Sequence, residues 1–575
     1  MTWRATAAIR IRRERLGLSQ ATLAKHLGVS KSLLSHFESG SRQPTEQQIT
    51  KLAELLQMPA DLLALGLGRL PDDIAIVLDD SPVTLAAAVR SKVEAKAINY
   101  PTSPSRTLAP RRAMSRTPVY ELPEKIDAEK TSSSYRAHSY HTKVPPEAIR
   151  PFIRAFTKAG DTVFDPFCGS GMTGVAALME GRNALLSDLS SAAVHISRNY
   201  TSPCDAPAFK AALARVESSI APTMRWLYRP LGSDTTVEYT TWSDVFRCLR
   251  CGDEFRYWDL MGNRTGADSD RITCRNCGST SRKSELEWVG EEPVQSHTSS
   301  GSNRIDTHAP TREELALIDE ANGTPIPYWI PDVPFGTERE MWRAAHQSMS
   351  INSVADFFTR RNLHALSALR HVIVSEGDCR VREALMFAFT AAVNRASKRY
   401  QWNAKRPTNV MTGTLYISSL RYEWNVWSLF RRKASDVLRY YLEFPSSKAT
   451  VEVFHRSATD LNCLPDQSVD MVFMDPPFGS NIFYADSSLL WEAWLGQLTD
   501  PAQEIVVNKH RKEATGGKSV AAYGELLGQA FQQSGRILRK GGRAVLAFSN
   551  SDDKVWQALQ EALNQAGFDT ESVHV

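Results

Sequence analysis

The sequence predicts an α/β fold in which a parallel sheet carries helices on both faces, with a small all-α unit before it. Two observations predict the sheet. A strand, a glycine turn, a helix and a second strand follow one another in "DTVFDPFCGSGMTGVAALMEGRNALLSDLS", and strands alternate with helices again over the last 125 residues. The all-α unit is predicted by short capped helices within residues 8–66. A long middle segment separates the two halves of the sheet.

Length and composition set the limits of this prediction. A chain of 575 residues is too long for one hydrophobic core, and we expect about three or four domains. With 42% hydrophobic and 23% charged residues it has the composition of a globular protein. The net charge of +4 is small, so binding to a polyanion must come from local clusters. Because no signal-peptide pattern and no apolar run of about 18 residues is present, we expect a cytoplasmic protein with no membrane partner.

The first element, residues 1–70, has the pattern of a helix-turn-helix. In "LSQATLAKHLGVSKSLLSHFESGSRQP", Leu23 and Leu27 share one face of a short helix that Ser19 can cap. The chain then turns at Gly28 and begins a second helix capped by Ser30. Residues 1–60 carry nine Lys or Arg against four Asp or Glu, so this unit is basic where the whole chain is not.

These residues resemble the Cro and phage-repressor family, whose second helix enters the major groove of DNA. The resemblance implies a phosphate contact near Gln20. It also implies an exposed recognition face made of Lys31, Ser32, Ser35 and His36. The alternative is a helical bundle used for protein contacts. After it, residues 71–134 form a helical and linker segment, since proline, serine, threonine and arginine replace aliphatic residues in "YPTSPSRTLAPRRAMSRTP".

Residues 135–205 form the first half of the sheet and hold the glycine turn. Gly169 and Gly171 follow a strand and open a helix, so bare backbone N–H groups can approach a ligand. Asp188 ends the next strand 23 residues after Asp165, where a carboxylate can take the hydroxyls of a ribose. Asp165 and Phe167 would repel a pyrophosphate, which favours a ligand with a positive or amino-bearing group, such as S-adenosylmethionine. The alternative is a tight turn without a ligand.

The turn resembles the cofactor motif of the DNA amino-methyltransferases, which implies a Rossmann-like class I S-adenosylmethionine-dependent methyltransferase sheet. In that family the aromatic residue packs on the cofactor, the aspartate after the second strand holds the ribose, and an upstream segment contacts the methionine end. "SYHTKVPPE" resembles that upstream segment. By this resemblance the cofactor-binding residues are Thr142, Lys143, Asp165, Phe167, Gly169, Gly171, Thr173 and Asp188, with Asp460 at the adenine ring.

Residues 450–575 form the second half of the sheet. We expect strands at 451–454, 469–474 and 544–548, and helices near 486–495, 523–538 and 553–566. A sheet of this class usually closes with a seventh, antiparallel strand. The sequence ends at "TESVHV", within the expected sixth strand, so either the sheet edge is completed from elsewhere or the chain is cut short.

The segment "FMDPPFGS" carries the proposed chemistry. Asp475 and the Pro476 carbonyl can accept the two hydrogens of an exocyclic amine, which favours the pyramidal nitrogen that attacks a methyl group. Pro477 adds stiffness, because prolines lack an N–H and restrict the backbone. Phe478 would stack on a base that has left the duplex.

The same segment resembles the (Asp/Asn/Ser)-Pro-Pro-(Tyr/Phe/Trp) motif of the amino-methyltransferases, in which an initial aspartate favours adenine N6 over cytosine N4. It follows the cofactor motif after a long insert, as in the alpha arrangement of that family. "NIFYADSSLLWEAWLG" also resembles the adenine methylases that bear a zinc ribbon. An incidental Asp-Pro-Pro turn is the alternative.

The insert, residues 206–449, is expected to recognise the target sequence. It holds a Cys-x2-Cys-x22-Cys-x2-Cys pattern, in which Cys248, Cys251, Cys274 and Cys277 would close a structural zinc site. Two redox-active pairs are the alternative. Further along, "NRASKRYQW" interleaves cations with aromatics, which suits DNA contact as well as it suits a solvated loop. The residues concerned are Arg395, Lys398, Arg399, Tyr400 and Trp402.

The sequence therefore predicts a site-specific DNA adenine-N6 methyltransferase that uses S-adenosylmethionine, binds double-stranded DNA and works in a restriction-modification or phage-defence setting. Because no nuclease or helicase motif was found, cleavage would need separate nuclease or defence-system subunits. Two alternatives stay open. One is a cytosine-N4 DNA or RNA amino-methyltransferase, and the other is a DNA-binding transcriptional regulator with a non-catalytic methylase scaffold.

Overall fold

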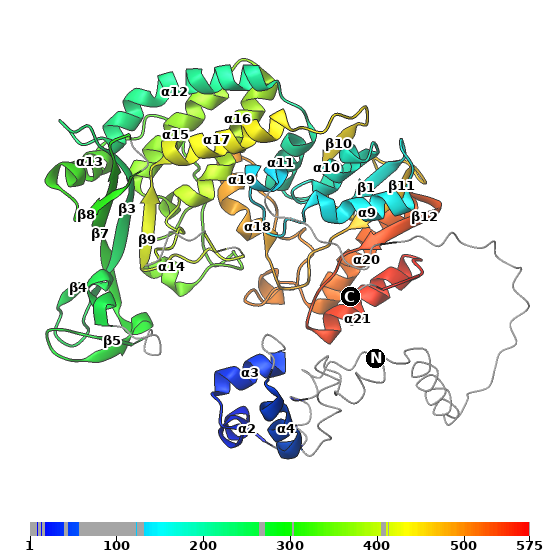
Figure 1. The fold of residues 1–575 in the computed structure, drawn as a ribbon, viewed down its shortest axis with the longest axis horizontal. Coiled ribbons are helices and arrows are strands. Elements are labelled where there is room, and N and C mark those ends of the chain that lie inside the picture. Colours follow the sequence, from blue (N-terminus) through cyan, green and yellow to red (C-terminus); the bar gives the residue numbers. More distant parts are fainter. Residues whose placement is uncertain are drawn as a thin grey trace, which may run out of the picture. The chain divides into compact units, whose positions relative to one another are not determined.

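A computed structural model describes residues 9, 13, 16, 18–39, 44–56, 122, 132–263, 271–301, 304–403, 410, 411 and 413–573. The chain divides into two compact units, Met1–Thr117 and Pro118–Val575. Figure 1 shows the elements of both. Most of the expected linker, residues 71–134, lies outside the described residues.

The first unit contains the expected helix-turn-helix. Its helices are α2 (Gln20–Leu27), α3 (Lys31–Ser39) and α4 (Glu46–Leu55). The Ser19 hydroxyl caps α2 by accepting the Thr22 N–H, and Gly28 ends the helix with a φ of 79°. The Ser30 hydroxyl accepts the Leu33 N–H at the start of α3. Buried apolar residues from all three helices form one small core. Local capping and turn signals were thus sufficient to predict this unit.

The second unit is built on a five-stranded parallel sheet. Across the sheet the strands are β10 (Val451–His455), β2 (Asn183–Asp188), β1 (Thr162–Asp165), β11 (Val469–Met474) and β12 (Leu538–Leu546). From β1 the chain moves to β2 and β10 on one side and later to β11 and β12 on the other. In open parallel sheets, ligands bind at the carboxyl ends of the strands beside such a reversal.

The expected strands are present, with two differences near the end of the chain. β12 begins at Leu538 rather than Ala544, because Leu538 already pairs with Val469 before a register shift in β11. Residues 569–573, expected in a sixth strand, form no strand in the described structure. Instead the Glu571 carboxylate forms an ion pair with Arg543 of β12 at 3.1 Å.

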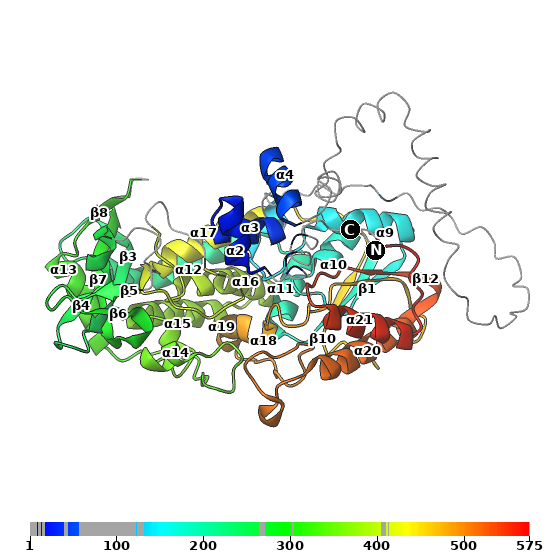
Figure 2. The same ribbon diagram turned by 90° about the horizontal axis from the view of Figure 1, so that it is seen from below.

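Helices cover both faces of the sheet (Figure 2). One face carries α9 (Pro146–Phe156), α10 (Met172–Met179) and α11 (Ser191–Thr201), and the other carries α20 (Val520–Ile537) and α21 (Asp553–Gln565). Val163 and Phe164, neighbours in β1, belong to separate apolar cores on the two faces, as the alternation of side chains along a strand requires. The short helices α8 (Ser133–Ala137), α18 (Tyr484–Ser487) and α19 (Leu489–Leu495) lie outside this layering.

The insert contributes helices and an antiparallel sheet. Its helices are α12 (Ala206–Tyr228), α13 (Arg312–Gly323), α14 (Ala344–Ser348), α15 (Arg360–Val374), α16 (Cys379–Ala396) and α17 (Val426–Leu442). Its sheet has the order β4 (Glu254–Arg256), β3 (Thr236–Arg247), β7 (Glu287–Ser299), β8 (Asp306–His308), with β9 (Leu420–Trp424) paired to β3. A separate hairpin joins β5 (Arg271–Thr273) to β6 (Thr280–Arg282).

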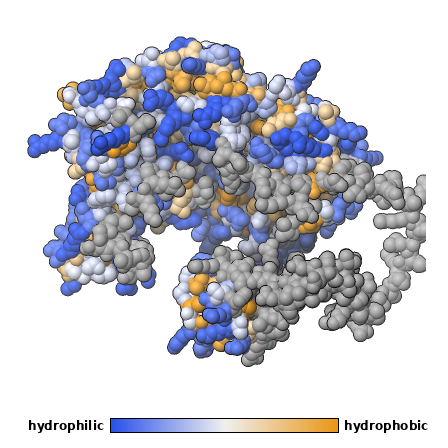
Figure 3. All heavy atoms as spheres, viewed as in Figure 1, coloured by the Kyte–Doolittle hydropathy of each residue, from blue (hydrophilic) through white to orange (hydrophobic). Residues whose placement is uncertain are grey.

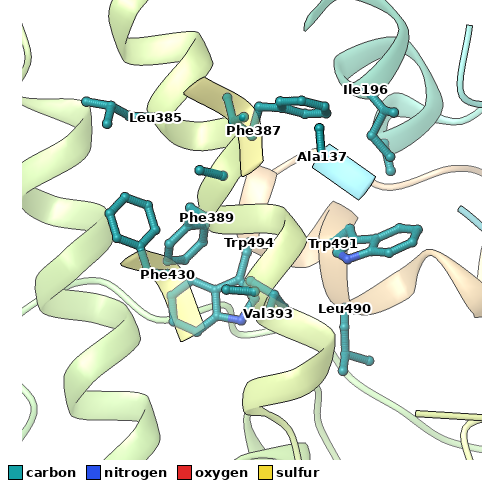
Figure 4. Packing of buried hydrophobic residues seen from close by; sticks show 14 of the residues in the cluster. Ala137, Ile196, Leu385, Phe387, Phe389, Val393, Phe430, Leu490, Trp491 and Trp494 are labelled. Atoms are coloured by element: carbon teal, nitrogen blue, oxygen red, sulfur yellow. The ribbon is translucent and has the colours of Figure 1, made fainter. Parts of the chain in front are cut away.

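The insert and the segment after the Asp-Pro-Pro loop share one apolar core (Figure 4). Trp491 and Trp494 of α19 are fully buried, and Phe387 and Phe389 of α16 lie beside them. The Phe389 and Trp494 rings meet nearly edge-to-face, with centroids 5.6 Å apart. Because this core is continuous, the insert is held firmly against the sheet that carries the loop.

The surface is mixed in character. On the face shown in Figure 3, hydrophilic residues surround several separate hydrophobic patches. None of the described helices combines the length and the apolar character needed to cross a bilayer.

Candidate functional site

One pocket lies at the carboxyl ends of β1, β2 and β11, beside the reversal of strand order. It encloses about 910 Å³ of empty space, part of which is open to solvent. Asp165 ends β1, Asp188 ends β2, and Asp475 follows β11, so parallel pairing places three carboxylates in one cavity. The glycine turn and the Asp-Pro-Pro loop, 306 residues apart from Gly169 to Asp475, therefore face the same space.

The two glycines of the turn have different roles. Gly169 lines the pocket with a φ of 49°, and its N–H donates to Asp188 Oδ2 at 2.8 Å. Gly171, with a φ of 77°, lies outside the lining, and a Cβ there would be 2.8 Å from the Ser197 Cα. We expected Gly171 to contact a cofactor directly. In the structure, its missing side chain instead lets α10 pack closely against α11.

Two carboxylates of the pocket are held by neighbouring donors. Asp165 accepts the Phe167 N–H at 2.9 Å and the Thr173 hydroxyl at 2.6 Å. Asp188 accepts the N–H groups of Gly169 and Ser190. Burial raises the pKa of Asp165 to about 7 and that of Asp188 to about 6, in spite of these hydrogen bonds. The donors fix the orientation of both groups at the pocket wall.

The third carboxylate, Asp475, is held differently. No described residue donates a hydrogen bond to its side chain or to the Pro476 carbonyl, whereas the next carbonyls are occupied. Pro477 O accepts from the Tyr523 hydroxyl at 2.9 Å, and Phe478 O accepts from Asn550 Nδ2 at 2.9 Å. Burial raises the pKa of Asp475 to about 7. The loop is thus anchored through its second half and leaves two acceptors free in its first half.

The three strand-end acids of the pocket have few positive neighbours within the described structure, and His455 is the group whose charge lowers the pKa of Asp188. None of Asp165, Asp188 and Asp475 forms an ion pair with a described residue. A cluster of buried carboxylates without ion-pair partners favours a ligand that brings positive charge with it.

Two aromatic rings of the pocket were not predicted from the sequence. Tyr140 and Tyr484 line it, with stacked rings whose centroids are 6.3 Å apart. The Tyr484 and Thr142 hydroxyls lie 3.1 Å apart, so Thr142 lines the pocket as expected. Phe478, the expected stacking partner of a base, lies outside the lining and meets Phe548 edge-to-face at 5.1 Å. The tyrosines belong to "SYHTKVPPE" and "NIFYADSS", so the resemblance found the segments but not these side chains.

Two expected cofactor residues do not reach the pocket. The Lys143 amine is buried beneath it and donates to the Ser134 and His138 carbonyls and to the Tyr200 hydroxyl. The exposed Asp460 carboxylate lies 3.7 Å from the Arg456 guanidinium, outside the lining. Ser457 and Ala458 line the pocket instead, because the chain turns away from it after these residues.

The four cysteines of the insert come together as the spacing predicted. Their sulfur atoms all lie within 4.8 Å of one another, with Cys248 to Cys277 and Cys251 to Cys274 each at 3.7 Å. Sulfurs bound to one tetrahedral zinc at about 2.3 Å would be about 3.8 Å apart. In each pair a glycine N–H donates back to the first cysteine carbonyl, and the two loops have matching geometry. The donor set therefore fits a closed zinc site.

On the helix-turn-helix, the expected recognition face is exposed. Lys31, Ser32, Ser35 and His36 are exposed on α3, opposite the buried Leu34 and Phe37. Gln20 was expected near phosphate, but its amide donates to Glu38 at 2.7 Å. Glu38 also binds Arg13. Gln20 thus takes part in an internal network that joins α2 to α3.

The basic segment of the insert does not form the expected surface. Arg399 is 2% exposed, and its guanidinium donates to the Met411 and Thr414 carbonyls, so the prediction that it contacts DNA is wrong for this structure. Tyr400 is also buried, at 7% exposure. Lys398 forms an ion pair with Glu291 at 2.9 Å. The remaining two, Arg395 and Trp402, are partly buried, and the Trp402 ring meets that of Trp258 edge-to-face.

Comparisons with known proteins agree with this geometry. The sequence model of the DNA methylase family matches residues 83–199, which include the glycine turn, and that of a helix-turn-helix domain matches residues 6–65. The type II methyltransferase M.XycI of Xanthomonas campestris pv. cyanopsidis is 50% identical over 46 residues, which are 8% of this chain and 15% of that protein. The putative methylase YubD of Escherichia coli (strain K12) is 40% identical over 62 residues, which are 11% of this chain and 27% of that protein.

The matched segments thus span less than a third of either relative. No solved structure matches the chain significantly. The chain is thus similar to the DNA methylase family over residues 83–199 and to a helix-turn-helix domain over residues 6–65, and the parallel sheet with its pocket is consistent with the first likeness.

Proposed function

We propose that the protein transfers a methyl group from S-adenosylmethionine to the N6 amine of adenine in double-stranded DNA. The observation that carries this proposal is the Asp475 carboxylate, which accepts no hydrogen bond from a described residue and lines a pocket that Gly169 and Asp188 also line. The Pro476 carbonyl, likewise without a described donor, follows it directly in the chain, although Pro476 is not among the lining residues. An exocyclic amine has two hydrogens to donate, and two fixed acceptors match it. The preference for adenine rests on the resemblance of the loop.

The acceptors would activate the amine by orienting it. When both hydrogens are held, the nitrogen lone pair leaves the plane of the ring and points at the methyl donor. The Asp475 charge also stabilises the positive charge that develops on the nitrogen, in a buried site where electrostatic interactions are strong. Hydrogen bonds from Tyr523 and Asn550 hold the loop in place, so little reorganisation is needed when the base arrives.

The cofactor would occupy the side of the pocket formed by the glycine turn. When bound, S-adenosylmethionine supplies an electrophilic methyl on a sulfonium. Asp188 would accept hydrogen bonds from the ribose, and Thr142 and Asp165 would face the methionine end. The positive charge of the ligand would offset the electrostatic cost of three buried carboxylates. The base must leave the duplex to enter, and Tyr140 and Tyr484, two of the aromatic residues that line the pocket, would stack on it.

The other elements would support this reaction. We propose that the four cysteines bind a structural zinc and that α3 reads DNA. One experiment tests the reaction itself. Duplex DNA is incubated with labelled S-adenosylmethionine and the protein, then digested to nucleosides that are identified by mass. N6-methyladenine supports the proposal, N4-methylcytosine would change the assigned base, and unlabelled nucleosides would reject it.

A further inference from the structure

The segment 499–518 joins α19 to α20 and forms one wall of the pocket. Thr499, Gln503, Glu504 and Ile505 line the cavity. The Val507 N–H donates to the Gly479 carbonyl at 3.2 Å, directly after the Asp-Pro-Pro loop. In both views the orange chain between α19 and α20 extends outward from the rest of the unit (Figures 1 and 2). The segment therefore begins at the pocket, extends outward in its middle and returns at Lys518, which donates to the Pro501 carbonyl.

A single carboxylate from the insert holds the middle of this segment. Glu340, 3% exposed, accepts the backbone N–H groups of Lys509, His510 and Arg511 at 2.8, 2.6 and 3.0 Å. It also accepts Asn508 Nδ2 at 3.1 Å. Burial alone would raise the pKa of Glu340, but these donors outweigh it and lower the pKa. Glu340 is thus ionised, and its hydrogen bonds hold the backbone of residues 508–511 in place.

The outer part of the segment is held in a defined shape. The Lys518 N–H donates to Asn508 Oδ1 at 2.8 Å, which closes the base of a loop. Arg511 donates to the Thr515 carbonyl at 2.9 Å across it. Gly516 has a φ of 80°, and a Cβ at Gly517 would be 2.2 Å from the Arg511 carbonyl oxygen, so the turn requires glycine at both positions.

The charges of the loop divide into inward and outward groups. Lys518 Nζ points inward and donates to the Pro501 carbonyl at 2.7 Å. Lys509 and Lys512 are exposed, and neither forms an ion pair with a described residue. An exposed loop that serves only as a connection does not need four hydrogen bonds to a buried carboxylate. This loop holds two exposed cations at a fixed place, and the first of them follows two residues after the hydrogen bond from Val507 to Gly479.

We propose that Lys509 and Lys512 contact the phosphates of duplex DNA next to the extruded base, and that Glu340 is the positioning residue that holds them there. The inference rests on the proposed function, since it takes DNA as the substrate. Phosphates are the complement of fixed, unpaired lysines, and contacts to them set the position of a protein on DNA without reading sequence. Because Glu340 belongs to the insert, the position of the insert fixes the position of the loop that carries the two lysines.

The test compares the wild-type full-length chain with the double variant Lys509→Ala/Lys512→Ala on a methylatable duplex. Lys158→Ala/Lys448→Ala is the matched control, because these exposed lysines lie before β1 and β10, at the amino ends of the strands and so opposite the carboxyl ends that hold the pocket. Two lost phosphate contacts should reduce the slope of log K against log salt by about 1.8 and weaken binding at least about tenfold at 0.1 M salt. The control should match wild type in the salt slope and in the affinity for DNA. All three proteins should bind S-adenosylmethionine equally.

Glu340→Gln tests the positioning role. It places an amide donor against N–H groups, so it should raise the KM for DNA with little change in the affinity for S-adenosylmethionine, while Lys509→Ala should have less effect in this background than in wild type. Equal salt slopes for wild type and the lysine double variant would overturn the proposal. If DNA binding depends on the two lysines but no methyl is transferred, the proposed function fails while this inference stands.

Discussion

Replacing Asp475 with asparagine should inactivate the enzyme and at the same time stabilise the fold above neutral pH. The side chain keeps its shape and one acceptor but loses its charge. Because removal of a preorganised electrostatic group costs about 10²–10³-fold in rate, we expect a loss of that order in methyl transfer. Binding of S-adenosylmethionine should survive, since Asp188 and the glycine turn are intact.

The gain in stability follows from burial. The pKa of Asp475 rises from 3.8 to about 7, roughly three units at about 1.4 kcal/mol each, or at most about 4 kcal/mol. Since the pocket is open to solvent, we expect about 1–4 kcal/mol. The folded state binds the proton more tightly than the unfolded state. The stabilisation by protonated Asp475 is therefore complete below pH 4 and is lost as pH rises towards 7, and the asparagine variant avoids this loss.

The assay is thermal unfolding of wild type and Asp475→Asn at pH 5 and pH 8, with methyl transfer measured in parallel. The unfolding temperature of the variant should exceed that of wild type by several degrees more at pH 8 than at pH 5. Asp460→Asn is the control, because that exposed carboxylate lies outside the pocket and should change neither stability nor transfer. Undiminished methyl transfer would refute the catalytic role of Asp475, and a variant that gains no more stability at pH 8 than at pH 5 would refute the burial argument. In wild type, kcat/KM should rise with pH through about 7, as Asp475 ionises.

Three further predictions concern other parts of the chain. Gly171→Ala should cost about 2–4 kcal/mol of unfolding free energy, because its positive φ and the helix backbone 2.8 Å away both oppose a Cβ; Gly181→Ala, with positive φ but open space, should cost about 1 kcal/mol. Cys251→Ser should release one zinc per chain in a colorimetric assay, whereas the exposed Cys463→Ser should release none. Lys31→Ala should weaken duplex binding about 5–10-fold at 0.1 M salt without changing cofactor affinity, and unchanged binding would remove α3 as the DNA contact.

Features that depend on a few neighbouring residues were predicted well. The capped helices at Ser19 and Ser30, the strand at 469–474 and the cysteine pairs follow from local chemistry, such as a hydroxyl before an apolar helix face or two thiols three residues apart. Three carboxylates of the pocket, Asp165, Asp188 and Asp475, were also predicted, because each one ends or follows a strand and parallel strands bring such ends together. The fourth, Glu504, was not predicted.

Features that depend on burial were predicted poorly. Lys143, Arg399 and Tyr400 have residue types that suggest contact with ligand or DNA, but each is buried in the folded chain. The Lys143 amine is solvated by carbonyls and a tyrosine hydroxyl, and the Arg399 guanidinium by the carbonyls of a later loop. The type of a charged residue does not show whether it lies at the surface or is paired in the interior.

The sequence alone thus determined which segments form strands, helices and paired cysteine turns, since caps, periodicity and backbone preferences act over a few residues. Only the tertiary structure decided which side chains share the cavity: it brought Tyr140 and Tyr484 together across more than 340 residues and clamped the loop at 509–511 onto Glu340. The physical reason is that side-chain partnership depends on how layers pack, and the free energy of that packing is summed over residues from the whole unit.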